Sequence, residues 1–135
     1  ILKKFACFGS DCPQTCCSGW RISLDDQDIQ YYKKNKHSFG HFIKSFDFEN
    51  KCLQTIDNKC SNLDSKGLCE LQKQHTHRVL PLTCKIYPRI FLEYRQDIYV
   101  IVALSCPEIV NLIFDSTDLL WTPKKKISSQ FKLLE

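Results

Sequence analysis

Apolar positions along the first third of the chain recur at helical spacing. Ser23 precedes a segment with three aspartates near its start and lysines near its end, which predicts a helix that Ser23 caps and whose charges complement the helix dipole. Ser38 then precedes a second amphipathic segment and is placed to cap it. Its apolar side chains stand at i, i+3, i+4 and i+7 and predict an aromatic stripe in the core: Phe39, Phe42, Ile43 and Phe46.

The later pattern is shorter in period and predicts strands and turns. Residues 52–71 are turn-rich, and residues 89–95 and 98–104 are rich in β-branched and aromatic side chains, which predicts a hairpin turning at Gln96–Asp97 without the usual glycine. Pro107 suits the first turn of a further helix. That helix has an apolar face: Ile109, Leu112 and Ile113. We expect an α+β fold, residues 1–135 as one cysteine-cluster domain with a short hairpin, several helices and irregular metal-ligating loops.

Composition excludes few classes of protein, but it limits the expected partners and the expected cellular compartment. Hydrophobic residues make up 43% and charged residues 25% of the 135, which is ordinary for a globular domain. The net charge of +4 comes partly from Lys124–Lys126, interpreted as a polar tail, so we expect no nucleic-acid partner. No apolar run approaches the roughly 20 residues that span a bilayer, and no export leader is evident, so we expect a cytoplasmic protein without a membrane partner. Methionine is absent, so we expect a fragment or a processed form.

Nine cysteines carry most of the chemical information. Their number is odd and nothing marks export, which favours metal binding over a disulfide framework. The local spacing C-x4-C-x3-C-C lacks the paired C-x2-C knuckles of zinc ribbons, so the ligands must be gathered from separate loops. Both a tetrahedral Zn²⁺ and a [4Fe–4S] cluster suit four thiolates. The adjacent Cys16 and Cys17 are expected to play different roles, because consecutive side chains point in different directions.

Four blocks of sequence carry a resemblance to a known family. CFGSDCPQTCCSGWRISLD, KCSNLDSKGLCEL, LPLTCKIYPRI and LSCPEIVNLI resemble, in order, the motifs of the flagellin lysine-N-methylase family. A weaker likeness extends to the zinc- or iron-chelating cysteine-cluster proteins. The resemblance implies methyl transfer from S-adenosylmethionine to flagellin lysines by a protein that holds a [4Fe–4S] cluster. Full-length relatives are longer, and no G-x-G-x-x-G signature is present, so the fragment alone is expected to be inactive if the donor binds elsewhere.

The resemblance also implies which cysteines bind metal. The matching positions are Cys7, Cys12, Cys16, Cys17, Cys60, Cys69, Cys84 and Cys106. Cys52 falls outside the blocks and is interpreted as a buried or incidental thiol. Eight ligands exceed one cluster, so either two centres form or some cysteines are structural. For a single cluster the favoured four are Cys17, Cys60, Cys69 and Cys84.

Several other residues have both a possible functional role and an ordinary structural role. Trp20 is a candidate for cofactor binding, as a shield over a cluster, or else a core residue. Arg89 is a candidate partner for a cofactor carboxylate or for the anionic cluster, or else forms a surface salt bridge. Glu108 suits a base for a lysine ammonium but also an ordinary first-turn acid. His75 and His77 are interpreted as solvated rather than as ligands. The alternative function is a zinc-stabilised protein-interaction module without catalysis, and an iron–sulfur electron carrier is a third.

Overall fold

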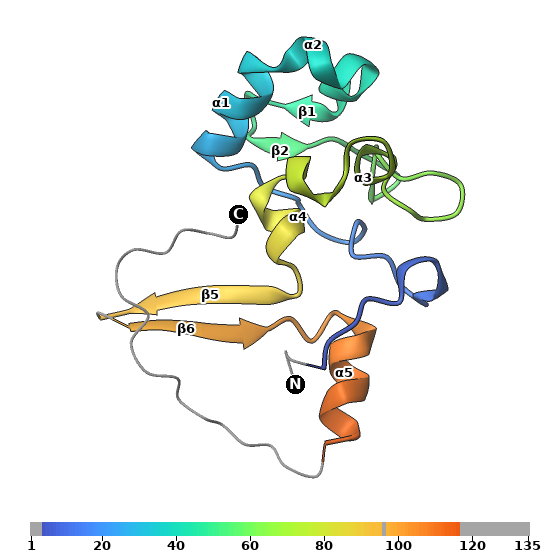
Figure 1. Ribbon diagram of the computed structural model, residues 1–135, viewed down its shortest axis with the longest axis vertical. Coiled ribbons are helices and arrows are strands. Elements are labelled where there is room, and N and C mark those ends of the chain that lie inside the picture. Colours follow the sequence, from blue (N-terminus) through green and yellow to red (C-terminus); the bar gives the residue numbers. More distant parts are fainter. Residues whose placement is uncertain (1–3, 96, 117–135) are drawn as a thin grey trace. The chain divides into compact units, whose positions relative to one another are not determined.

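The computed structural model describes residues 4–95 and 97–116, and it divides the chain into two compact units. The cysteine unit is Phe8–Tyr87, and the hairpin unit combines the chain start up to Cys7 with the segment from Pro88 onward. Short helices and two-stranded antiparallel ladders confirm the α+β class (Figure 1). Lys124–Lys126 lie outside the described residues.

The first long helix of the cysteine unit is α1 (Asp26–Lys34), and Asp25, not Ser23, caps it. The carboxylate of Asp25 accepts the backbone N–H of Asp28, and the carboxylate of Asp28 accepts the backbone N–H of Asp25. This reciprocal capping box explains why Asp25 is the cap in place of the predicted Ser23, because it satisfies two backbone N–H groups at once. Ser23 instead forms an isolated bridge with Cys52.

The predicted second helix is broken into three pieces. Helix α2 (Lys36–Phe39) ends at Gly40, where a φ of +51° stops the α-helix, and a 3-10 segment, η2 (Gly40–Ser45), leads into β1 (Phe46–Asp47). Ser38 therefore lies inside α2 and caps nothing. The aromatic stripe is nevertheless in the core as expected, since its three phenylalanines are at most 5% exposed and Ile43 packs against them.

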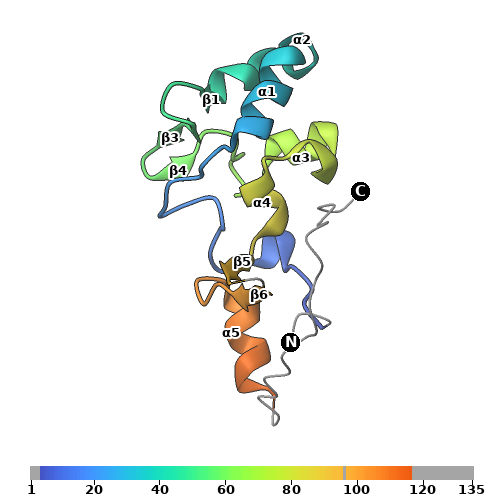
Figure 2. The ribbon, with the colours of Figure 1, turned by 90° about the vertical axis from the view of Figure 1, so that its left-hand side faces the viewer.

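Short ladders and turns occupy the middle of the chain, as the sequence predicted. Strand β1 pairs with β2 (Cys52–Leu53), and β3 (Thr55–Ile56) pairs with β4 (Lys59–Cys60) across Asp57 and Asn58, both with positive φ. Figure 2 brings the β3–β4 ladder into view. The remaining elements of the unit are η1 (Gly9–Asp11), α3 (Glu70–His75), η3 (His77–Val79) and α4 (Leu82–Ile86).

The core of the cysteine unit is centred on Tyr32, which has no solvent exposure. Its ring lies 4.0 Å from that of Phe46 and 5.0 Å from that of Phe39, centroid to centroid. Its hydroxyl donates to the backbone carbonyl of Val79 and so ties α1 to η3. Aromatic packing of this kind stabilises by more than its buried area alone.

The hairpin unit contains β5 (Arg89–Tyr94), β6 (Asp97–Val102) and α5 (Pro107–Phe114). Asp97 pairs with Tyr94, so Asp97 belongs to the strand and the predicted turn is shifted toward Arg95, whose φ is +59°. Pro107 does begin α5, and Ile109 on its apolar face is fully buried. Among the described residues, no helix has the length and apolar character to cross a membrane.

Candidate metal centre

Cysteines of the cysteine unit stand on four separate segments: the loop with Cys16 and Cys17, the end of β4 with Cys60, the residue before α3 (Cys69), and α4 with Cys84. The backbone N–H of Cys60, at the end of β4, donates to the carbonyl of Cys17 at 2.7 Å, which fixes the N-terminal loop beside the ladder. Cys69 precedes α3 and forms an isolated bridge with Leu63, just beyond β4. Cys84 lies within α4. The sequence separation between these cysteines is therefore closed by backbone structure.

Four of these thiols pack against one apolar core. Cys60 is 5% exposed and belongs to that core, and Cys17, Cys69 and Cys84 are partly buried against it. These are the four cysteines that the sequence analysis favoured for a single cluster. Their role as ligands stays a prediction, but the fold places all four at the same apolar surface.

The charges of these thiols raise one another's pKa values. Burial raises the pKa of the Cys84 thiol, and the charges of Cys60, Cys69 and Cys16 raise it further. Burial likewise raises the pKa of Cys60, with Cys69 and Cys16 adding to the effect. Such mutual repulsion indicates that these thiols belong to one neighbourhood. A cation placed among them would reverse these shifts, because metal binding stabilises the thiolate.

The adjacent pair Cys16 and Cys17 is divided between two environments, as expected. Their Sγ atoms lie 4.0 Å apart, and neither is in a disulfide. Hydrogen bonding from Cys17 lowers the pKa of Cys16 to about 7, and Cys16 is exposed. The same contact, together with burial, raises the pKa of Cys17. Cys16 is thus the readily ionised thiol and Cys17 the one that packs inward.

The donor set fits a thiolate-ligated metal in number and chemistry. Four sulfurs in an apolar setting are what a closed tetrahedral zinc site or a [4Fe–4S] cluster requires. Within the described residues, however, no three His, Cys, Asp or Glu side chains already converge closely enough to hold an ion. The cluster of Cys16, Cys17, Cys60, Cys69 and Cys84 is therefore a set of neighbouring ligands that binding has to draw together, which is common where metal binding is coupled to folding.

The other predicted ligands are not in this group. Cys12 belongs to the same unit, but its thiol donates to the backbone carbonyl of Gln14. Cys7 and Cys106 belong to the hairpin unit, where Cys7 is exposed and Cys106 is 8% exposed and precedes α5. Cys52, which the motifs leave out, lies in β2 and lines a pocket instead.

Trp20 lies next to the thiols but not in the core, so the core interpretation is wrong. It is 38% exposed, its Nε1 donates to the carbonyl of Cys16 at 2.8 Å, and its ring stacks on that of Tyr87 with the centroids 6.1 Å apart. Arg89, at the start of β5 in the hairpin unit, has its guanidinium over the ring of Phe5 at 5.7 Å. Cofactor binding by Trp20 and by Arg89 stays a prediction.

The remaining candidate residues, two histidines and one glutamate, lie in ordinary structural positions. His75 is only partly solvated, because it is half-buried at the end of α3 and its ring centroid lies 5.4 Å from that of Phe39. His77 is exposed, as expected. Glu108 occupies the first turn of α5.

The sequence analysis missed Asp28, which connects α1 to the element carrying Cys84. Its carboxylate oxygens both lie 3.1 Å from the backbone nitrogen of Leu82, the first residue of α4. The two residues are 54 positions apart, and no local pattern announces such a contact.

The cysteine unit contains a group of partly buried thiols, which short helices and strands hold around a small core. This arrangement defines a cysteine-rich metal-binding domain. The chain belongs to the family described as "Putative zinc- or iron-chelating domain", whose model matches residues 6–107. The resemblance carried by the four sequence blocks is confirmed at this level.

Individual relatives agree with that assignment. The chain is 29% identical to the flagellar biosynthetic protein FliU of Salmonella muenchen, over 99% of this chain and 85% of that protein. It is 30% and 31% identical to the lysine-N-methylases of Salmonella typhimurium and Salmonella choleraesuis, in each case over 96% of this chain. The chain spans 35% of the length of these two enzymes. No solved structure matches it.

Proposed function

We propose that this chain is the metal-binding part of a cytoplasmic protein lysine N-methyltransferase, with a [4Fe–4S] cluster as its metal centre. The observation that carries the proposal is the neighbourhood of Cys17, Cys60, Cys69 and Cys84 at one apolar surface. Relatives named lysine-N-methylase support the reaction. A cytoplasmic setting keeps such thiols reduced and able to bind iron.

The methyl donor in this proposal is S-adenosylmethionine and the acceptor is a lysine of flagellin. The printed name of the flagellar relative supports a flagellar substrate. A sulfonium carries the methyl group in activated form, and the acceptor lysine must lose a proton before its nitrogen attacks. The chain's own contribution is to hold the cluster among partly buried thiols, where low solvent access tunes the properties of the bound iron.

Metal analysis of the anaerobically purified chain tests the metal assignment. We expect about four irons and four sulfides per chain and a broad absorbance near ~400 nm, typical of thiolate-ligated clusters. Cys60→Ser and Cys84→Ser should each lose most of the iron. Cys52→Ser is the matched control, because Cys52 is a partly buried thiol outside the group, and it should keep its iron.

Two results would redirect the proposal. A colourless chain that binds one Zn²⁺ would replace it with the zinc-stabilised interaction module. Equal iron loss from the Cys52 variant and the Cys60 variant would remove the ligand assignment. The reaction itself is tested with the full-length parent, flagellin and labelled donor, and absence of label on lysine would remove the methyltransferase claim.

A further inference from the structure

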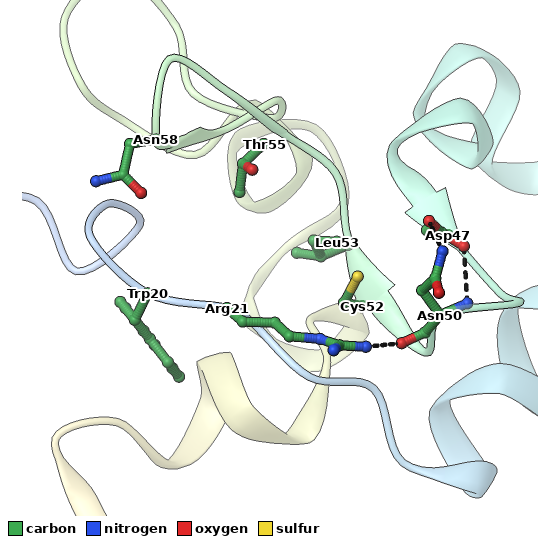
Figure 3. A pocket seen from close by; sticks show the side chains of 8 residues that line it. All are labelled: Trp20, Arg21, Asp47, Asn50, Cys52, Leu53, Thr55 and Asn58. Atoms are coloured by element: carbon green, nitrogen blue, oxygen red, sulfur yellow. Dashed lines mark hydrogen bonds between the residues drawn. The ribbon is translucent and has the colours of Figure 1, made fainter.

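A pocket of about 440 Å³ opens on the cysteine unit (Figure 3). Its lining combines an aromatic ring, one cation, one anion and several amide or hydroxyl groups: Trp20, Arg21, Asp47, Asn50, Cys52, Leu53, Thr55 and Asn58. Its volume falls in the range of small-molecule sites, ~300–1,000 Å³. The motifs singled out only Trp20 among these residues.

Two hydrogen bonds fix the walls of the pocket, one between backbone groups and one from the Arg21 side chain. The backbone N–H of Gly19 donates to the carbonyl of Asn58 at 3.0 Å, which seats the Trp20 segment against the β3–β4 turn. On the other side, the Arg21 guanidinium donates to the carbonyl of Asn50, in the turn between β1 and β2. Figure 3 shows the Arg21 side chain extending from the Trp20 side toward Asn50.

The charged groups of the pocket, Asp47 and Arg21, are each hydrogen-bonded to Asn50 and not to each other, although the Arg21 charge also lowers the pKa of Asp47. Asp47 accepts hydrogen bonds from the backbone N–H and the side-chain amide of Asn50, both at 2.9 Å, and these bonds hold its pKa below the usual range. No salt bridge joins Asp47 to Arg21 within the part of the chain that the structure describes. Because one N–H group of Arg21 serves Asn50, the guanidinium retains further donors for a ligand.

The aromatic ring of the pocket, like the Arg21 guanidinium, remains accessible to a ligand. Trp20 is 38% exposed although its ring also stacks on Tyr87, and its Nε1–H is already used by the carbonyl of Cys16. Its free surface therefore offers stacking rather than hydrogen bonding. A planar heterocycle is the group that gains most from such a surface.

From this arrangement we infer that the pocket binds the methyl donor, an adenosyl amino acid, with its adenine on Trp20 and its amino-acid carboxylate on Arg21. Asp47 then faces the α-ammonium group of the same ligand. The lining agrees with this ligand class, since an elongated molecule with a planar ring at one end and a zwitterion at the other would place each group opposite a suitable side chain. That this ligand is a methyl donor rests on the proposed function. The assignment makes Arg21, in place of Arg89, the partner of the carboxylate.

Fluorescence of Trp20 tests the inference directly. The chain has two tryptophans, so Trp121→Phe leaves Trp20 as the sole reporter. S-adenosylhomocysteine, the demethylated product, should quench this fluorescence to saturation. Adenosine, which lacks the amino acid, should quench it with lower affinity.

A charge variant separates the two ends of the ligand. In the Trp121→Phe background, Arg21→Gln should weaken S-adenosylhomocysteine binding by about tenfold or more, because a charge-assisted hydrogen bond is lost, and should leave adenosine binding within about twofold. Arg78→Gln is the control and should change the binding of neither ligand. Asp47→Asn should repeat the Arg21 pattern, and it keeps the inference testable if loss of the Arg21–Asn50 bond unfolds the turn.

The outcomes also distinguish this inference from the proposed function. If equilibrium dialysis retains labelled donor on the chain while Arg21→Gln and Asp47→Asn bind like the wild type, the pocket is the wrong site and the methyltransferase proposal stands. Weakening by Arg89→Gln instead would assign the carboxylate to that residue. If S-adenosylhomocysteine neither quenches Trp20 nor is retained, the pocket inference is overturned, whatever the full-length parent does.

Discussion

Replacing Asp28 with alanine should destabilise the cysteine unit and loosen the helix that carries Cys84. The carboxylate is 8% exposed and accepts the backbone N–H of Leu82, at the start of α4, and that of Asp25 in the capping box of α1. Both donors lose their acceptor in Asp28→Ala. The variant therefore tests a contact between two helices far apart in sequence.

The expected loss in the free energy of unfolding follows from these two hydrogen bonds. A hydrogen bond to a charged group contributes about 1.5–3 kcal/mol, and one arm of the capping box adds about 0.5–1 kcal/mol. Burial raises the pKa of Asp28, which shows that holding its charge inside has a cost that alanine relieves. We therefore expect the free energy of unfolding to fall by about 2 kcal/mol, toward the lower end of the 2–4 kcal/mol sum.

Urea unfolding followed by circular dichroism measures this change, and iron content measures its effect on the metal centre. Asp26→Ala is the matched control, because Asp26 lies in the same helix turn and its salt bridge to Lys51 is exposed on both sides. The control should leave stability nearly unchanged. If the two variants prove equally stable and hold equal iron, Asp28 does not dock α4 and the reasoning fails.

Three further predictions concern titration, reactivity and the core. The folded state raises the pKa of Asp28, so protonation of this carboxyl favours folding. This proton-linked part of the stability is full below the ordinary carboxyl pKa of 3.8 and is lost as pH rises through the raised value. Asp28→Asn should therefore flatten that part of the pH–stability profile from urea titrations. In metal-free protein at pH 7, iodoacetamide should modify Cys16 well before Cys84, as peptide mass spectrometry would show, because the pKa of Cys16 is lowered to about 7 and that of Cys84 is raised. Reversal of that order would contradict the electrostatics of the thiol group. Tyr32→Phe should cost about 1–3 kcal/mol in thermal or urea unfolding, because the carbonyl of Val79 loses its buried donor, and a neutral result would mean that water or another group replaces it.

Local patterns predicted the elements better than their ends. The aromatic stripe from Phe39 to Phe46 was correctly assigned to the core because periodic apolar residues are buried whatever backbone carries them. Its single helix was wrong, since Gly40 takes a positive φ and divides the segment. The cap of α1 was misplaced by two residues because a reciprocal pair of aspartates outcompetes one serine.

By itself the sequence determined the α+β class, the hairpin, the metal-binding family and the cysteines of its motifs, because these depend on spacing and residue type. Only the tertiary structure decided which thiols are neighbours, that Asp28 docks α4, and that Arg21 and Asp47 share a pocket with Trp20. The physical reason is that each of these contacts joins residues from separate elements. The amino-acid sequence specifies which chemical groups are present, and the packing of the core determines which of these groups are in contact.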